Sequence, residues 1–100
     1  MILHTVNKSP RASSCMDSCL RFMLPGCGLL LLEDGVYGAM ATPENHQRLT
    51  AVPDNCRLYV LEEDLLARGL LQTVSEVFEI ISYQGFVEIC TEYSKIQNWN

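Results

Sequence analysis

The residues of this sequence best suited to chemistry are its five cysteines, Cys15, Cys19, Cys27, Cys56 and Cys90. A thiol becomes a good nucleophile when it is exposed and when a nearby cation or a helix N-terminus lowers its pKa. The number of cysteines is odd, and the N-terminus has no apolar run long enough for a signal peptide. We therefore expect a cytoplasmic protein with reduced thiols and no disulfide framework.

Cys15 and Cys19 lie four residues apart in a predicted helix, which places them on the same helical face. Arg11 precedes Cys15 by one turn and is expected on that face, where its charge would favour a Cys15 thiolate. Cys19 is expected among apolar neighbours such as Met16 and Leu20. The local sequence thus favours Cys15 as a reactive thiol and Cys19 as a small core residue.

Metal and nucleotide sites are poorly supported by the remaining residues. Cys15 and Cys19 would supply two ligands of a zinc ion, but zinc needs about four, and no second pair of cysteines or histidines accompanies them. The loop at residues 5–11 (TVNKSPR) contains no glycine that would let backbone N–H groups cradle a phosphate. We predict no cofactor and no metal.

An acidic triplet, Glu62, Glu63 and Asp64, is the other candidate for metal binding or acid–base chemistry. These residues open a predicted helix that ends at Arg68-Gly69. Acidic residues in the first turn and a basic residue in the last turn stabilise the helix dipole, and glycine is a common C-cap. We interpret the triplet as structural.

The chain alternates apolar runs with segments of helical period, which is typical of an α/β domain. We predict strands at residues 1–6, 28–33, 57–61 and 77–82, with the second strand central and buried. The first predicted helix begins at Ser9-Pro10 and ends near Leu24. The second begins at Thr42-Pro43 and ends at Pro53, after a helical turn at most at residues 36–41. Two further helices are predicted at residues 62–69 and 84–93. The predicted core positions of the first and last helices are Ala12, Met16, Cys19, Leu20 and Met23, then Phe86, Val87, Ile89 and Cys90.

This order predicts one domain, residues 1–100, with a mainly parallel sheet of four to five strands and helices on both faces. Chemistry in such folds takes place beyond the carboxyl ends of the strands, here residues 4–10, 33–38 and 62–64. The chain ends in a tail with Ile96 and Trp99, and we expect Trp99 either to pack onto the domain or to anchor a partner.

The composition limits the classes of partner. The net charge is −5, and the seven lysines and arginines are scattered singly, which disfavours direct binding to nucleic acid. The longest apolar run, residues 29–32, is too short to span a membrane. Hydrophobic residues make up 48% of the chain and charged residues 19%, so a domain this small is expected either to pack most of its apolar surface or to cover some of it with a partner.

Four segments resemble the TusB/DsrH family of sulfur-relay proteins: ILHTVNKSP, LLLLEDGVYGA, LYVLEEDLLARGL and YQGFVEICTEYSKIQNW. They cover most of the chain in the family's order, whereas residues 40–56 contribute little. The resemblance implies a DsrE-like fold and a place in a heterohexamer with TusC/DsrF-like and TusD/DsrE-like subunits. In such complexes sulfur moves as a cysteine persulfide to a TusE/DsrC-like acceptor, for 2-thiolation of the wobble uridine of tRNA or for dissimilatory sulfur oxidation.

The resemblance also bears on Cys19, because the segment SCLRF matches the position of a first-helix cysteine in DsrH-type members. The family's principal sulfur-accepting cysteine lies in the TusD/DsrE subunit. We therefore predict a relay subunit that mainly builds the complex and is not an enzyme as a lone chain, with Cys19 as its candidate persulfide carrier and tRNA thiolation as the role of the complex. A second hypothesis is an active carrier subunit in which Cys19 takes up the persulfide. The alternatives are a DsrH-type subunit in sulfur oxidation, a purely structural subunit without a sulfur-carrying cysteine, and an independent small-molecule or nucleotide-binding domain.

Overall fold

A five-stranded parallel sheet forms the centre of the molecule. The computed structural model describes residues 1–100. The strands, in the order β4-β3-β2-β1-β5 across the sheet, are β1 (Ile2–Val6), β2 (Gly28–Leu31), β3 (Arg57–Leu61), β4 (Glu79–Ile81) and β5 (Lys95–Trp99). All four residues of β2 are buried, as expected for a continuous apolar run at the centre of a parallel sheet.

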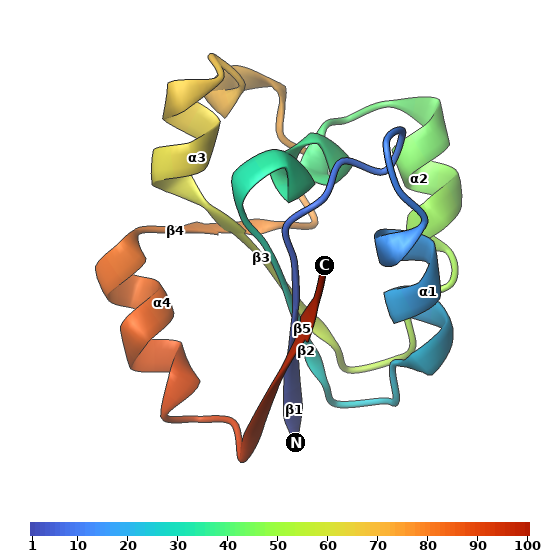
Figure 1. The fold of residues 1–100 in the computed structure, drawn as a ribbon, viewed down its shortest axis with the longest axis vertical. Coiled ribbons are helices and arrows are strands. Elements are labelled where there is room, and N and C mark those ends of the chain that lie inside the picture. The colour runs from blue at the N-terminus through green and yellow to red at the C-terminus, as the bar shows by residue number, and fades with distance from the viewer.

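Helices cover both faces of the sheet, which confirms the predicted architecture. They are α1 (Cys15–Phe22), α2 (Pro43–Leu49), α3 (Glu62–Ala67) and α4 (Tyr83–Cys90), with 3₁₀ helices η1 (Glu33–Ala39) and η2 (Leu71–Thr73). Figure 1 shows α1 and α2 on one side of the sheet and α4 on the other. Because η1 and α3 follow directly on β2 and β3, they lie beyond the carboxyl ends of these strands.

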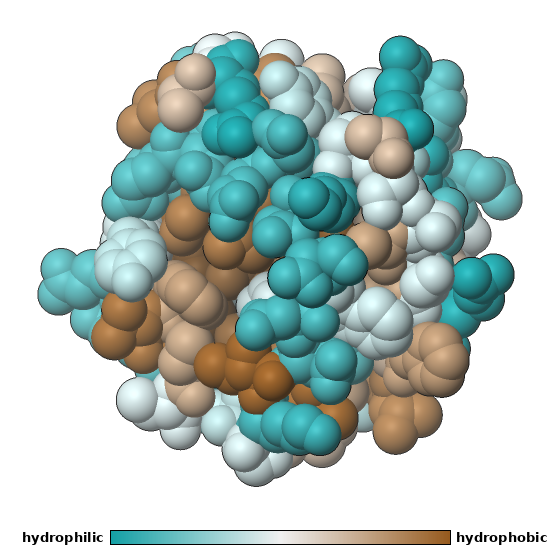
Figure 2. Space-filling view, in the orientation of Figure 1, coloured by the Kyte–Doolittle hydropathy of each residue, from teal (hydrophilic) through white to brown (hydrophobic).

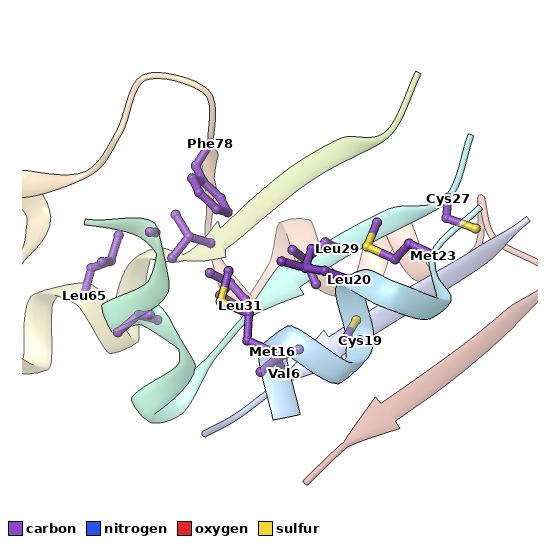
Figure 3. Close-up of a cluster of buried hydrophobic side chains, with 13 residues drawn as sticks. Val6, Met16, Cys19, Leu20, Met23, Cys27, Leu29, Leu31, Leu65 and Phe78 are labelled. Atoms are coloured by element: carbon purple, nitrogen blue, oxygen red, sulfur yellow. The ribbon is translucent and has the colours of Figure 1, made fainter. Parts of the chain in front are cut away.

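The larger hydrophobic core lies on the face of the sheet covered by α1, which we call the α1 face. It contains 13 buried residues, among them Leu29, Leu31 and Val60 from the strands and Met16 and Leu20 from α1 (Figure 3). The opposite face, called the α4 face, has a core of five buried residues: Leu3, Leu30, Tyr59, Ile81 and Ile89. Helix α4 alone packs on this face, and Val87 of α4 is 52% exposed, so its predicted inward orientation is wrong.

Helix α1 begins later than the sequence predicted. The N–H groups of Ala12 and Ser13 do donate to the Ser9 carbonyl oxygen, both at 3.1 Å, but this turn is not continued. A serine side chain then interrupts the backbone pattern, since the Cys15 N–H donates to Ser13 Oγ at 3.1 Å, and the helix starts at Cys15 with Ser14 as N-cap. Ala12 is exposed in the turn and is not a core residue, contrary to the prediction.

The C-terminal segment forms a strand where the sequence indicated only a tail. β5 pairs in parallel with β1, with Leu3 opposite Ile96 and Val6 opposite Trp99. β5 is an edge strand with exposed and half-buried residues, so it lacks the apolar run that marks β2. The 3₁₀ helix η1 is also longer than the predicted turn at 36–41, whereas α2 begins at Pro43 with the Thr42 side chain as N-cap, as predicted.

Candidate functional site

Two hollows open at the carboxyl ends of the strands, where the fold predicts a site. The larger, about 440 Å³, lies between the loop after β1, η1 and α2. Its lining residues are Ser9, Pro10, Arg11, Tyr37, Met40, Thr42, Glu44, Asn45 and Arg48. The smaller, about 220 Å³, is lined by Thr5, Asn7, Leu32, Glu33, Asn98, Trp99 and Asn100. Neither hollow is lined by a cysteine, so neither places a nucleophilic thiol at this edge of the sheet.

The polar groups of the larger hollow are mostly engaged within the protein. The buried Asn45 side chain donates to the carbonyl oxygens of Tyr37 (2.9 Å) and Met40 (3.0 Å). Its Oδ1 accepts from Arg48 Nη1 at 2.8 Å, and Arg48 Nε lies 3.4 Å from Asp17. These bonds fix α2 against η1, so we interpret the cluster as structural.

The acidic triplet at the start of α3 joins separate elements rather than forming a site. Asp64 Oδ2 accepts the Glu33 N–H at 2.6 Å, and the Glu63 carboxylate accepts the Tyr83 N–H at 3.0 Å. The first bond holds Glu33 at a φ of +50°, a left-handed conformation that costs a non-glycine residue free energy. Arg68 completes the network, donating to Asp34 Oδ1 at 2.9 Å and to the Asp64 carbonyl oxygen at 3.1 Å. The structural interpretation of the triplet agrees with these contacts.

Cys19 lies on the buried face of α1, with no exposed surface (Figure 3). Burial raises the pKa of the Cys19 thiol from 9.0 to about 12, and the neighbouring thiols Cys27 and Cys15 add to this effect. Such a thiol is protonated at neutral pH, which makes it a poor nucleophile in this conformation. The core position therefore matches the expectation from local sequence, and sulfur transfer through Cys19 stays a prediction.

Cys15 does not have the neighbour that the sequence predicted. It is the first residue of α1 and is partly exposed, but Arg11 lies in the turn before the helix rather than on the same helical face. The predicted electrostatic support of Cys15 by Arg11 along one helix is therefore wrong, because the helix that would align them starts too late.

A buried histidine at the α1 face was not singled out by the sequence. Trp99 Nε1 donates to His4 Nδ1 at 3.0 Å, so the proton of a neutral His4 ring is on Nε2, which is buried without a partner. Burial lowers the pKa of His4, which keeps the ring neutral. Trp99 also packs against Phe22, with ring centroids 5.7 Å apart. The aromatic residue near the C-terminus thus packs onto its own domain, one of the two predicted outcomes.

No set of three or more histidine, cysteine or acidic side chains is close enough to hold a metal ion. None of the helices combines the length and apolar character needed to cross a membrane. What the described geometry offers is a well-packed domain with buried or partly buried thiols and no assembled group of catalytic side chains.

Comparison with known proteins gives the family. Residues 8–96 match the family described as "DsrH like protein". The chain belongs to the DsrH/TusB family. It is 35% identical to Protein TusB of Erwinia tasmaniensis and 36% identical to Protein TusB of Pectobacterium carotovorum, covering 98% of this chain and all of each relative. This confirms the resemblance found in the four sequence segments and makes the chain a TusB-family sulfur-relay protein.

Solved structures confirm the DsrE-like fold of this family member. The ychN protein of E. coli superposes with a TM-score of 0.77 over 98% of this chain and 97% of its own, at 17% identity. A Thermotoga maritima protein solved by NMR gives a TM-score of 0.67 over 92% of this chain and 93% of its own, at 18% identity.

Proposed function

We propose that this chain is a subunit of a heterohexameric sulfur-relay complex with TusC/DsrF-like and TusD/DsrE-like subunits, and that the complex passes persulfide sulfur to a TusE/DsrC-like acceptor for 2-thiolation of tRNA wobble uridine. The observation that carries this proposal is the similarity to Protein TusB over the whole length of both chains. The acidic chain does not bind tRNA itself in this proposal; the acceptor delivers the sulfur.

Exposed apolar side chains support an assembling role. Figure 2 shows hydrophobic surface between α4 and the sheet, on the α4 face. Val87 of α4 is 52% exposed and Ile96 of β5 is 40% exposed. Because burial of apolar surface is favourable, a monomer that exposes such side chains beside a small core is stabilised when homologous subunits cover them.

In this proposal the chain acts mainly by building the complex, because the Cys19 thiol is buried and protonated. The carrier alternative needs α1 to move so that Cys19 meets a sulfur donor. The presence of a cysteine in the first helix favours this alternative, and with it a DsrH-type role in sulfur oxidation. Both versions place the chain in the same kind of complex.

Co-expression with TusC-like and TusD-like subunits tests the proposal. We expect the three chains to co-purify and the complex to restore 2-thiouridine in a host that lacks its own TusB. A monomer by size exclusion in the presence of both partners would contradict the assembly. The variant Cys19→Ser then separates the two versions. Unchanged tRNA thiolation supports the scaffold version. Lost thiolation with an intact hexamer, together with an added sulfur atom on Cys19 of the parent complex by mass spectrometry, supports the carrier version.

A further inference from the structure

Cys27 and Cys56 each come directly before one of two neighbouring parallel strands, β2 and β3, at the amino ends of the sheet and away from both hollows. The register pairs Gly28 with Arg57, and the Arg57 N–H donates to the Cys27 carbonyl oxygen at 3.3 Å. Continued one residue before the two strands, this register places Cys27 opposite Cys56. Residues so placed on neighbouring strands have Cα atoms about 4.8 Å apart, inside the range of roughly 4.4 to 6.8 Å that a disulfide spans.

The two side chains also point to the same side of the sheet. Cys27 belongs to the core of the α1 face, and Cys56 packs against that core. Cys27 is only 2% exposed, whereas Cys56 is partly exposed. A reagent from solvent can therefore reach Cys56, while Cys27 lies behind it and is sheltered.

The turn before β2 surrounds the Cys56 sulfur with backbone groups. Cys56 Sγ donates to the Leu24 carbonyl oxygen at 3.4 Å. Burial raises the pKa of the Cys56 thiol, and the neighbouring Cys27 and Asp54 add to this effect, while the nearby backbone N–H groups of Gly26 and Cys27 act in the opposite direction. The thiolate that forms at Cys56 is thus held next to Cys27.

We propose that Cys27 and Cys56 form a dithiol site that reduces the sulfane sulfur of a persulfide and becomes an intramolecular disulfide. The choice of sulfane sulfur as substrate rests on the proposed function in sulfur relay. The pairing of the thiols rests on the register and on the side of the sheet that both cysteines share. The site differs from Cys19, which lies on α1 and has no exposed surface.

The reaction proceeds in two exchanges. The Cys56 thiolate attacks the outer sulfur of R–S–SH, forming Cys56–S–SH and releasing R–SH once a proton is taken up. The Cys27 thiol loses its proton and attacks the inner sulfur of Cys56–S–SH, forming the Cys27–Cys56 disulfide and releasing H₂S. The two cysteines lose two electrons and the sulfane sulfur gains them, so one persulfide and two thiols give R–SH, H₂S and one disulfide.

Glutathione persulfide, added anaerobically to the reduced full-length chain, tests the site. We expect about one sulfide released per chain and a Cys27–Cys56 disulfide in the peptide map. Cys56→Ser, whose hydroxyl can still donate to the Leu24 carbonyl oxygen, should abolish both. Cys90→Ser is the matched control, because Cys90 is also partly buried but lies on α4 away from the pair, and it should leave both unchanged. A persulfide that persists on Cys56, or a disulfide with another cysteine, would overturn the proposal.

A second oxidant separates this site from the proposed function. Oxidised glutathione should give the same disulfide and release two glutathione molecules, whatever complex the chain joins. A disulfide with oxidised glutathione but not with the persulfide would overturn the sulfane-sulfur substrate. A mixed disulfide left on Cys56 would overturn the pairing itself. Co-purification with the sister subunits is read independently, so its failure would count against the proposed function and not against the dithiol.

Discussion

The two faces of the sheet differ in how much core they hold. The core on the α1 face contains 13 buried hydrophobic residues, drawn mainly from the strands, α1, η1 and α3, whereas the α4 face buries five beneath a single helix. Hydrophobic stabilisation grows with the apolar area removed from water. The α1 face should therefore supply most of the free energy of folding. Exposed apolar side chains remain on both sides of the sheet, Phe22 of α1 and Val87 of α4 among them.

The largest effect should come from truncating the α1 core. Leu31→Ala removes a side chain with no exposed surface and leaves a cavity among close-packed neighbours. We expect a loss of about 3–5 kcal/mol in the free energy of unfolding, against about 2–3 kcal/mol for Ile89→Ala on the α4 face. Urea denaturation of both variants measures the difference. Equal losses would mean that the two faces contribute alike.

Two glycines allow a second comparison, in which a methyl group is added to a close-packed position instead of being removed. A Cβ at Gly35 would collide with the backbone carbonyl oxygen of Val6, which cannot move without shifting β1. A Cβ at Gly28 would collide with the Tyr93 hydroxyl, which is the far end of a side chain and can move at the cost of its 3.2 Å contact with the Tyr59 hydroxyl. We expect Gly35→Ala to cost about 3 kcal/mol and Gly28→Ala about 1 kcal/mol, within the usual range for overpacking. Thermal unfolding orders the two variants, and the reverse order would mean that the Tyr93 side chain yields less readily than the backbone of β1.

The free energy of unfolding should depend on pH because the Cys19 thiol is buried in the core of the α1 face. Its pKa is about 12 in the folded protein and returns towards 9.0 on unfolding. A raised folded-state pKa gives stability that is complete below the unfolded pKa and is lost as the pH rises towards the folded one. We expect wild type to lose about 1 kcal/mol more than Cys19→Ala between pH 9 and 10. The slopes of unfolding free energy against pH measure this, and parallel slopes would place the Cys19 thiol in contact with water.

The sequence predicted those parts of the fold whose signals are local. The apolar run of β2 and the acidic first turn of α3 identified both elements, because burial on two faces and the helix dipole each act within one segment. The start of α1 was missed because Ser13 competes for a backbone N–H. β5 was missed because its pairing with β1 joins residues more than ninety positions apart.

The candidate sites show the same limit. Local sequence placed Cys19 in the core correctly, since its neighbours on α1 are apolar. It also favoured Cys15 as the reactive thiol because of the charge of Arg11, an argument that holds only if both residues lie in one helix. The Cys27–Cys56 pair had no local signal, because the register of β2 and β3 brings these thiols together. The position of His4 against Trp99 likewise follows from the pairing of β1 with β5.

The smallest effect should come from the exposed rim of the α4 face. Arg57 Nη2 lies 2.8 Å from Glu79 Oε1, with both side chains more than half exposed, and its guanidinium lies 5.2 Å from the centre of the Tyr59 ring. An exposed ion pair contributes about 0–1 kcal/mol because water and salt screen it. A cation–π contact whose guanidinium is mostly exposed adds about 0.5–1 kcal/mol. Glu79→Gln removes only the ion pair, so we expect it to cost less than Arg57→Ala, and both to cost less than Ile89→Ala. Urea denaturation at low and high salt checks this order, since the Glu79→Gln loss should vanish at high salt. A loss at Arg57 as large as that at Ile89 would mean that the polar rim, rather than the small apolar core beneath α4, holds this face of the sheet together.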